Sequence, residues 1–332
     1  MEKILEVSHL KKYFKTPHGM LHAVDDVSFT LNTGETLGVV GESGCGKSTL
    51  GRTVLGLLEP TAGKIIFEGR DVTHVSGKER KALRKDMQII FQDPFSSLNP
   101  RMCVADLIAD PLKTYRLYKH KADRDRRVAE LMDVVGLARR LAYSYPHELD
   151  GGRRQRIGIA RALALDPKFI VCDEPVSALD VSIQAQVLNL LQDLQEARGL
   201  TYIFVTHDLS VVKHISTDIM VMYVGCVVEK CGADELFEHQ LHPYTKGLLS
   251  AIPIPDIHRE KKRILLKGEL TSPVNPKPGC RFANRCNYAK DRCRCEQPPL
   301  EEVLPNHWVA CHYVREINNL QATAVPETSV QS

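Results

Sequence analysis

The segment Gly41-Glu42-Ser43-Gly44-Cys45-Gly46-Lys47-Ser48 is rich in glycine and ends in Lys-Ser. It follows an apolar run at residues 36–40 that predicts a strand, and it precedes a segment that predicts a helix. Glycines let backbone N–H groups turn towards phosphate oxygens, and the positive end of the following helix favours the same anion. The pattern predicts a phosphate-binding loop in which Lys47 contacts the β- and γ-phosphates of a nucleotide and Ser48 ligates Mg²⁺. An ordinary glycine turn before a helix is the alternative, and the complete pattern disfavours it.

A second predicted strand, Phe169–Cys172, ends in Asp173-Glu174. In enzymes with a phosphate-binding loop, an aspartate at such a strand end lies beside Mg²⁺, and Glu174 is then placed to polarise the attacking water. Many strands end in acidic residues, so the pair alone is a weak signal. Together with the loop upstream it predicts nucleotide hydrolysis.

Predicted strands and helices alternate along most of the chain, and residues from about 98 to 166 are helical in pattern. Val128–Val135 has apolar residues at helical spacing, and Ser182–Ala197 is a further predicted helix. The predicted strands are Val27–Leu31, Thr36–Val40, Ile65–Phe67, Met87–Phe91, Phe169–Cys172, Tyr202–Val205 and Ile219–Tyr223. This order predicts an α/β core with a helical subdomain.

Composition limits the possible functions. The chain has 332 residues, of which 43% are hydrophobic and 26% charged, as is typical of a globular protein. Its net charge of +3 gives no argument for binding nucleic acid. The start, Met1–Phe14, lacks the apolar centre of a secretory signal, and no apolar run approaches the roughly 18 residues that a membrane-spanning helix needs. If the protein works at a membrane, we expect it to dock to other subunits.

The composition changes after about residue 253, where prolines surround a basic segment. We expect a core domain at 1–252, with its helical subdomain at about 98–166, and a small loop-rich extension at 253–316. Residues 317–332 are polar with little periodicity, which predicts a disordered tail.

Further segments resemble the motifs of ABC transporter ATP-binding subunits. Leu149-Asp150-Gly151-Gly152-Arg153 resembles the signature segment, usually Leu-Ser-Gly-Gly-Gln, and Ser177-Ala178-Leu179-Asp180 resembles the D-loop. Gln92 and His207, each after a predicted strand, resemble the Q-loop glutamine and the switch histidine. Together with the phosphate loop, these motifs cover about residues 4–235 in the family's order.

This resemblance implies a mechanism and a set of site residues. Two such domains pair head to tail and enclose two ATP molecules, each between one subunit's phosphate loop and the other's signature segment. Glu174 activates water, His207 holds the γ-phosphate, and Gln92 senses Mg²⁺ and couples the site to the membrane subunits. The implied Mg²⁺ ligands are Ser48, Gln92 and Asp173. The implied nucleotide contacts are Tyr13 (against adenine), Gly41, Glu42, Ser43, Gly44, Cys45, Gly46, Lys47, Ser48, Thr49 and Asp173, with Asp150, Gly151, Gly152 and Asp180 contributing across the subunit interface.

The extension indicates which kind of ABC transporter the chain resembles. The C-terminal motif of peptide importers is similar to Leu241-His242-Pro243-Tyr244-Thr245, Gly268-Glu269-Leu270 and Pro276-Lys277-Pro278-Gly279-Cys280. The segments Gly41–Gly51, Phe91–Arg101 and Pro175–Leu194 favour the DppF/OppF type, the second ATPase of the dipeptide and oligopeptide systems. The implied partners are a second ABC ATPase, two integral membrane permease subunits and an extracytoplasmic peptide-binding protein, with this chain peripheral on the cytoplasmic face of the inner membrane. Nickel and glutathione importers share much of the motif. A soluble ABC ATPase that acts on ribosomes or DNA is a further alternative, against which the chain has one cassette and no basic stripe.

Cysteines gather in the extension, where Cys280, Cys286, Cys293 and Cys311 have the spacing C-x5-C-x6-C-x17-C. Four thiolates can hold Zn²⁺ or an iron–sulfur cluster, and in a reducing compartment such clusters indicate metal rather than disulfides. The absence of a C-x2-C pair disfavours zinc. Three alternatives stay open: the site binds zinc, the site binds no metal, or Cys295 replaces Cys293 as a ligand. The resemblance to peptide importers implies a [4Fe–4S] cluster on the first four.

Two positions depart from the family pattern, Asp150 where it has Ser and Arg153 where it has Gln. The family's serine donates a hydrogen bond to the γ-phosphate of the opposite site, and a carboxylate cannot. At about 4 Å and an effective dielectric of about 20, the repulsion of one such charge pair is on the order of 4 kcal/mol before screening. Asp150 is also a good helix N-cap, and both descriptions can hold. We therefore expect an asymmetric heterodimer in which the partner's phosphate loop faces the altered segment.

Overall fold

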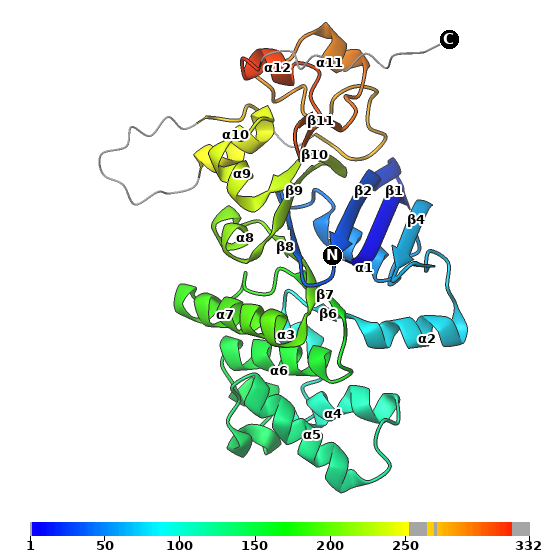
Figure 1. Cartoon of the computed structure of the whole chain (residues 1–332), viewed down its shortest axis with the longest axis vertical. Coiled ribbons are helices and arrows are strands. Elements are labelled where there is room, and N and C mark those ends of the chain that lie inside the picture. The colour runs from blue at the N-terminus through cyan, green and yellow to red at the C-terminus, as the bar shows by residue number, and fades with distance from the viewer. Residues whose placement is uncertain (1, 252–263, 269–270, 321–332) are drawn as a thin grey trace.

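The computed structural model describes residues 2–251, 264–268 and 271–320. Two sheets, a helical region and a C-terminal extension are arranged along the long axis of the molecule (Figure 1). The α/β core and the helical region predicted from the sequence are both observed.

The larger sheet has eight strands in the order β11-β12-β10-β9-β3-β8-β7-β6. Its strands are β3 (Thr36–Val40), β6 (Met87–Ile90), β7 (Phe169–Asp173), β8 (Thr201–Thr206), β9 (Asp218–Tyr223), β10 (Cys226–Gly232), β11 (Glu301–Leu304) and β12 (His307–Val309). The strands from β9 to β6 run parallel, and β3, β7 and β8 are buried along their whole length. Their continuous apolar runs are what a parallel sheet covered on both faces requires.

A second, antiparallel sheet lies beside the first, in the order β2-β1-β4-β5. It is built from β1 (Lys3–Thr16), β2 (Gly19–Asn32), β4 (Ala62–Phe67) and β5 (Arg70–Asp71). The helix α1 (Lys47–Val54) contacts strands of both sheets, and its Leu50 and Val54 belong to the apolar core that joins them. The phosphate loop is therefore fixed at a point where the two sheets meet.

Helices occupy most of the region predicted to be helical at about 98–166 (Figure 1, green, at the lower end). It contains α4 (Val104–Thr114), α5 (Lys121–Val134) and α6 (Gly151–Leu163), with 3-10 turns at Arg139–Tyr143 and Pro146–Glu148. The remaining helices are α2 (Gly77–Asp86), α3 (Pro94–Ser97), α7 (Val181–Arg198), α8 (Leu209–Ile215), α9 (Ala233–Glu238), α10 (Pro243–Ser250), α11 (Asp291–Cys295) and α12 (Val314–Ile317).

The extension continues the core sheet, because β12 pairs antiparallel with β10. A buried carboxylate reinforces this junction: Glu229 of β10 accepts from the backbone N–H groups of Leu241 (2.7 Å) and His242 (3.1 Å) and lies 2.8 Å from Nε2 of His307. Such a charge is tolerated inside a protein only when hydrogen bonds replace water. The extension is thus joined to the core by paired strands as well as by side chains.

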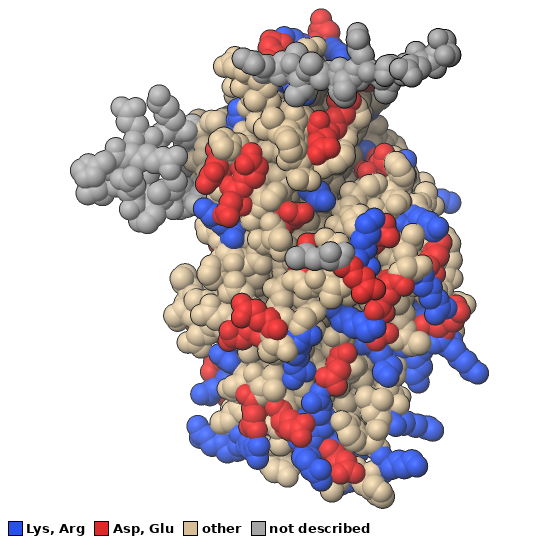
Figure 2. Space-filling view, viewed as in Figure 1, with Lys and Arg blue, Asp and Glu red and all other residues tan. Residues whose placement is uncertain are grey.

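The predicted domain boundary at 252/253 falls within residues 252–263, which lie outside the described ranges, so it stays a prediction. Residues 317–320, assigned to the tail from the sequence, are described: α12 ends at Ile317, and Leu320 packs against the apolar cluster around Leu241 and Val314. Residues 321–332 lie outside the described residues. Among the described residues, no helix combines the length and the apolar character needed to cross a membrane. On the face shown in Figure 2, positive and negative side chains are interspersed over the small sheet and the helical region.

Candidate nucleotide site

The phosphate loop connects β3 to α1 and wraps around the side chain of Lys47. The Lys47 ammonium donates to the carbonyl oxygens of Gly41 (2.8 Å) and Glu42 (3.0 Å), and the residue is only 4% exposed. Gly46 has φ of 104°, and a Cβ there would lie 2.0 Å from the Ala23 carbonyl oxygen. The loop therefore requires glycine at this position for both its backbone conformation and its close approach to β2.

Asp173, at the end of β7, contacts the start of α1. The Ser48 hydroxyl donates to its Oδ1 at 2.6 Å, and Arg52 reaches its Oδ2 at 3.2 Å. Asp173 is 1% exposed, so its carboxylate is enclosed by the protein. A hydroxyl and a carboxylate from two elements form an oxygen donor set of the kind that Mg²⁺ takes.

Glu174 is the centre of the group of residues predicted to be catalytic. Its backbone lies in the left-handed region (φ 49°), which is strained for a residue other than glycine, and its N–H donates to the Val205 carbonyl at 2.9 Å. Its Oε2 accepts from Nε2 of Gln92 at 2.9 Å and lies 3.2 Å from Nδ1 of His207. The residues follow β6, β7 and β8, whose carboxyl ends meet at one edge of the parallel sheet. The structure thus brings together the three residues predicted to be catalytic.

A single pocket joins these groups to the phosphate loop. Its polar lining comes from predicted residues, namely Ser43, Gly44, Gly46, Lys47, Ser48, Thr49, Gln92, Glu174 and His207. Its remaining lining was not predicted and comes from Phe14, Leu21, Ala23 and Pro273. The apolar part is suited to a nucleotide base, while the loop is suited to its phosphates.

Tyr13, which is expected to lie against adenine, makes contacts with other residues of the chain. Its ring stacks on His22 with a centroid distance of 3.9 Å, and its hydroxyl bonds to Asp25. The neighbouring Phe14 lines the pocket instead, because successive side chains of a strand point to opposite faces. The contact of Tyr13 with adenine stays a prediction, and Phe14 is an aromatic candidate that the sequence motif did not identify.

The signature segment lies outside this pocket, at the N-terminus of α6. The Asp150 carboxylate accepts from the Arg153 N–H at 2.8 Å and lies 3.4 Å from Nε of the same arginine. The expectation that Asp150 caps the helix is confirmed. Gly151 and Gly152 form the first turn of α6, and Asp180 caps α7 by accepting from the Ile183 N–H at 3.0 Å.

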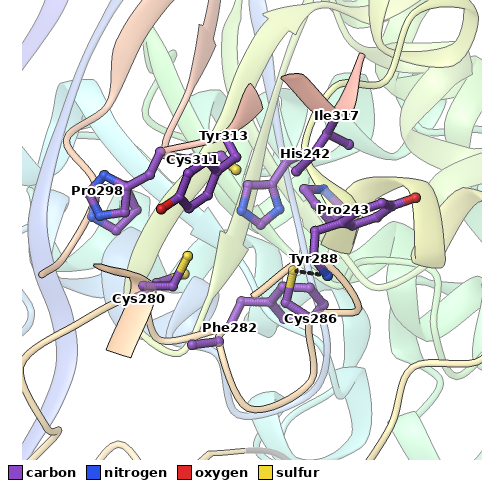
Figure 3. A pocket seen from close by; sticks show the side chains of 13 residues that line it. His242, Pro243, Cys280, Phe282, Cys286, Tyr288, Pro298, Cys311, Tyr313 and Ile317 are labelled. Atoms are coloured by element: carbon purple, nitrogen blue, oxygen red, sulfur yellow. Dashed lines mark hydrogen bonds between the residues drawn. The ribbon is translucent and has the colours of Figure 1, made fainter. Parts of the chain in front are cut away.

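Four cysteines line one narrow pocket in the extension, together with His242 and Phe282 (Figure 3). They are Cys280, Cys286, Cys293 and Cys311, whereas Cys295 is exposed and does not line it. Burial raises the pKa of the Cys280 thiol to about 12 and that of Cys311 to about 11, so any cation bound there must displace protons. Among the described residues, no group of three or more His, Cys, Asp or Glu side chains is arranged to hold a metal ion. The expected cluster ligands therefore converge on one pocket without forming a ready-made site for a single ion.

Comparison with known proteins agrees with this geometry. Residues 24–177 match the family model described as ABC transporter, and residues 228–293 match the model described as the oligopeptide/dipeptide transporter C-terminal region. The oligopeptide transport ATP-binding protein AppF of Bacillus subtilis is 52% identical, over 94% of this chain and 97% of its own length.

The chain belongs to the ABC transporter ATP-binding proteins of the oligopeptide transport family. The oligopeptide transport ATP-binding protein OppF of Salmonella typhimurium is 53% identical, with 92% of each chain covered. Among solved structures, the dimeric structure of a bacterial ABC transporter cassette matches with a TM-score of 0.64 and 29% identity, over 69% of this chain and 99% of that one. The fold class and the family predicted from the sequence are confirmed.

Proposed function

We propose that this chain, the ATP-hydrolysing subunit of an oligopeptide ABC importer, works as one half of an asymmetric pair of ATPase subunits. A second ABC ATPase completes the pair, which docks on two integral membrane permease subunits at the cytoplasmic face of the inner membrane. An extracytoplasmic peptide-binding protein delivers the cargo to the permeases. The dimeric form of a similar cassette supports the pairing, and the oligopeptide relatives favour peptide cargo over nickel or glutathione. The observation that carries the asymmetry is the contrast between the complete group around Glu174 and the carboxylate of Asp150.

In the chain's own site, Glu174 accepts a proton from the water that attacks the γ-phosphorus. The bond between that phosphorus and the β-bridging oxygen breaks, and ADP leaves with the bridging oxygen. Gln92 and His207 hold the Glu174 carboxylate from two sides, which fixes the direction in which it can accept the proton. Lys47 exchanges its loop carbonyls for phosphate oxygens when ATP binds. Ser48 and Asp173 would hold Mg²⁺, which would supply charge neutralisation at the phosphates.

The opposite half-site depends on Asp150. An ionised carboxylate accepts hydrogen bonds and has none to donate, so Asp150 cannot replace the family's serine at the partner's γ-phosphate. Arg153 is half-exposed and offsets the negative charge only in part, because such surface pairs are weak. The partner's site is therefore expected to bind ATP better than it hydrolyses it.

The test is Asp150→Ser in the reconstituted transporter, in a Glu174→Gln background that silences this chain's own site. The remaining turnover then reports the partner's site, and the new hydroxyl should raise it by about tenfold or more. Asp150→Gly is the matched control, because it keeps a good N-cap and removes the charge without adding a donor. Unchanged turnover and unchanged nucleotide occupancy in Asp150→Ser would refute the asymmetric pair.

We also propose that Cys280, Cys286, Cys293 and Cys311 hold a [4Fe–4S] cluster as a structural element of the extension. Their convergence on one pocket supports this. A four-iron cluster is wider than a single ion, and its four thiolate ligands stand further apart. The number and the type of ligands here match those of such a cluster.

Iron and acid-labile sulfide are measured after anaerobic purification. Cys293→Ser should lose both, and Cys295→Ser is the matched control that should keep them. Protein that contains only zinc, or equal loss in the two variants, would contradict the proposal.

A further inference from the structure

The extension forms part of the wall of the nucleotide pocket. Pro273 lines that pocket, and its carbonyl accepts from the backbone N–H of His22 on β2 at 2.9 Å. Asn275 pairs with Met20 of the same strand, with its N–H and its side-chain oxygen each at 2.8 Å from a Met20 backbone group. A segment far away in the sequence is thus tied to the strand that lines the apolar side of the pocket.

Arg285, one residue before Cys286, contacts the phosphate loop directly. Its Nη1 and Nη2 donate to the two carboxylate oxygens of Glu42 at 2.6 and 3.0 Å. The arginine side chain is 8% exposed, and its Nε donates to the Lys267 carbonyl at 3.3 Å. The Glu42 hydrogen bonds raise the pKa of Arg285, which stays charged. A two-point contact of this kind fixes the orientation of the loop residue as well as balancing its charge.

Glu42 is held from two further sides. Its backbone N–H donates to the Tyr244 hydroxyl at 2.9 Å, and its carbonyl accepts from the Lys47 ammonium at 3.0 Å. Among the described loop residues, Glu42 is therefore the one that contacts both Lys47, which is predicted to bind phosphate, and an arginine of the extension.

Arg281, one residue after Cys280, makes a corresponding contact with β2. It forms an ion pair with Asp25 and donates to the Val224 carbonyl at 2.8 Å, and its side chain is 6% exposed. Asp25 also bonds to the Tyr13 hydroxyl and lies 3.0 Å from Nδ1 of His22. Burial opposes ionisation of Asp25, but these partners outweigh it and hold the pKa of the carboxyl below its usual value.

We infer that Arg281 and Arg285 are positioning residues through which the extension sets the nucleotide affinity of this chain's site. Arg285 neutralises a carboxylate that would otherwise repel the phosphates entering the loop, and Arg281 holds the Asp25–Tyr13–His22 group behind the apolar side. The inference rests on ATP binding at the phosphate loop, and it does not depend on the asymmetric pair or on what the four cysteines bind.

Binding of ATP, ADP and AMP to the full-length chain, by competition with a fluorescent ATP analogue, tests this directly. Arg285→Gln should raise the Kd of ATP about tenfold and that of AMP much less, because Glu42 lies beside the group that contacts the β- and γ-phosphates. Glu42→Gln in the Arg285→Gln background should recover most of the affinity, since it removes the unbalanced charge. Arg281→Gln should raise the Kd of all three nucleotides by a similar factor. Arg292→Gln is the matched control, because among the described residues Arg292 forms an ion pair only with Glu296 of the same extension, and its side chain is 56% exposed.

Three results would overturn the inference. They are native affinity in folded Arg285→Gln, equal loss for ATP and AMP in that variant, and no recovery in the double variant. Thermal unfolding of each variant shows that it is folded. If Arg285→Gln is too unstable to titrate, Arg285→Lys replaces it. The lysine ammonium keeps the charge but cannot make the two-point contact. The Kd of ATP should therefore rise about threefold, and by more than the Kd of AMP. Native ATP affinity in Arg285→Lys, or equal loss for both nucleotides, then counts against the inference.

Discussion

The two halves of the ATP machinery in this chain differ in how far the fold has already arranged them. In the phosphate-loop half, Lys47 and Asp173 are almost fully buried and in contact with the groups around them. In the signature half, Asp150 and Arg153 have side chains 59% and 49% exposed and contact chiefly each other. The chain's own packing therefore completes one half-site, whereas in the proposed pair the other half acts only against a second subunit.

The difference explains where a departure from the family pattern is tolerated. Asp150 caps α6 as well as the family's serine would, so the fold does not select against it. A comparable change at Asp173 would leave Ser48 and Arg52 without their buried partner. A substitution that alters function without altering the fold is thus expected in the exposed half.

The largest effect should come from Glu174→Gln. The amide cannot take the proton of the attacking water, so ATP hydrolysis at this chain's site should fall about a thousandfold. ATP binding should persist, because Gln92, His207 and the phosphate loop are unchanged. Single-turnover hydrolysis in the reconstituted transporter measures the first effect and nucleotide titration the second. Residual turnover near the native level would show that the half-site described here is not the competent one.

The phosphate-loop half was largely predictable from the sequence, because its chemistry is local. Glycines, Lys47 and Ser48 stand in one short segment, and the acidic pair follows a strand that is readily recognised. The contact of Gln92 and His207 with Glu174 follows from parallel strands that end at one edge of a sheet.

The extension was less predictable, because its contacts join residues far apart in the chain. Periodicity indicates neither that β12 adds to the core sheet nor that Arg285 reaches Glu42, across more than 200 positions. The strand alternation that places Phe14 rather than Tyr13 in the pocket was present in the sequence, but the family motif directed attention to Tyr13.

A smaller effect should distinguish these two aromatic residues. Phe14→Ala removes a ring that lines the pocket, and loss of stacking against a base corresponds to about tenfold weaker ATP binding. Tyr13→Ala is the matched comparison on the opposite face of the strand. Because it removes the hydrogen bond to Asp25, it should weaken ATP binding by only about threefold. Titration with a fluorescent ATP analogue measures both. The reverse order would assign the adenine contact to Tyr13.

The smallest effect concerns the exposed half and tests whether Asp150 serves the fold. Asp150→Ala should lower the free energy of unfolding by about 1 kcal/mol, because the Arg153 N–H loses its acceptor, whereas Asp150→Ser should stay within about 0.5 kcal/mol of the native value. Asp180→Ala, which removes the equivalent cap of α7, is the matched control and should show a loss similar to that of Asp150→Ala. Urea unfolding followed by circular dichroism measures the change, and hydrogen exchange of the first turn of α6 locates it. If Asp150→Ala proves as stable as the native chain while Asp180→Ala does not, capping does not account for the carboxylate, and its reason must lie at the interface with the second subunit.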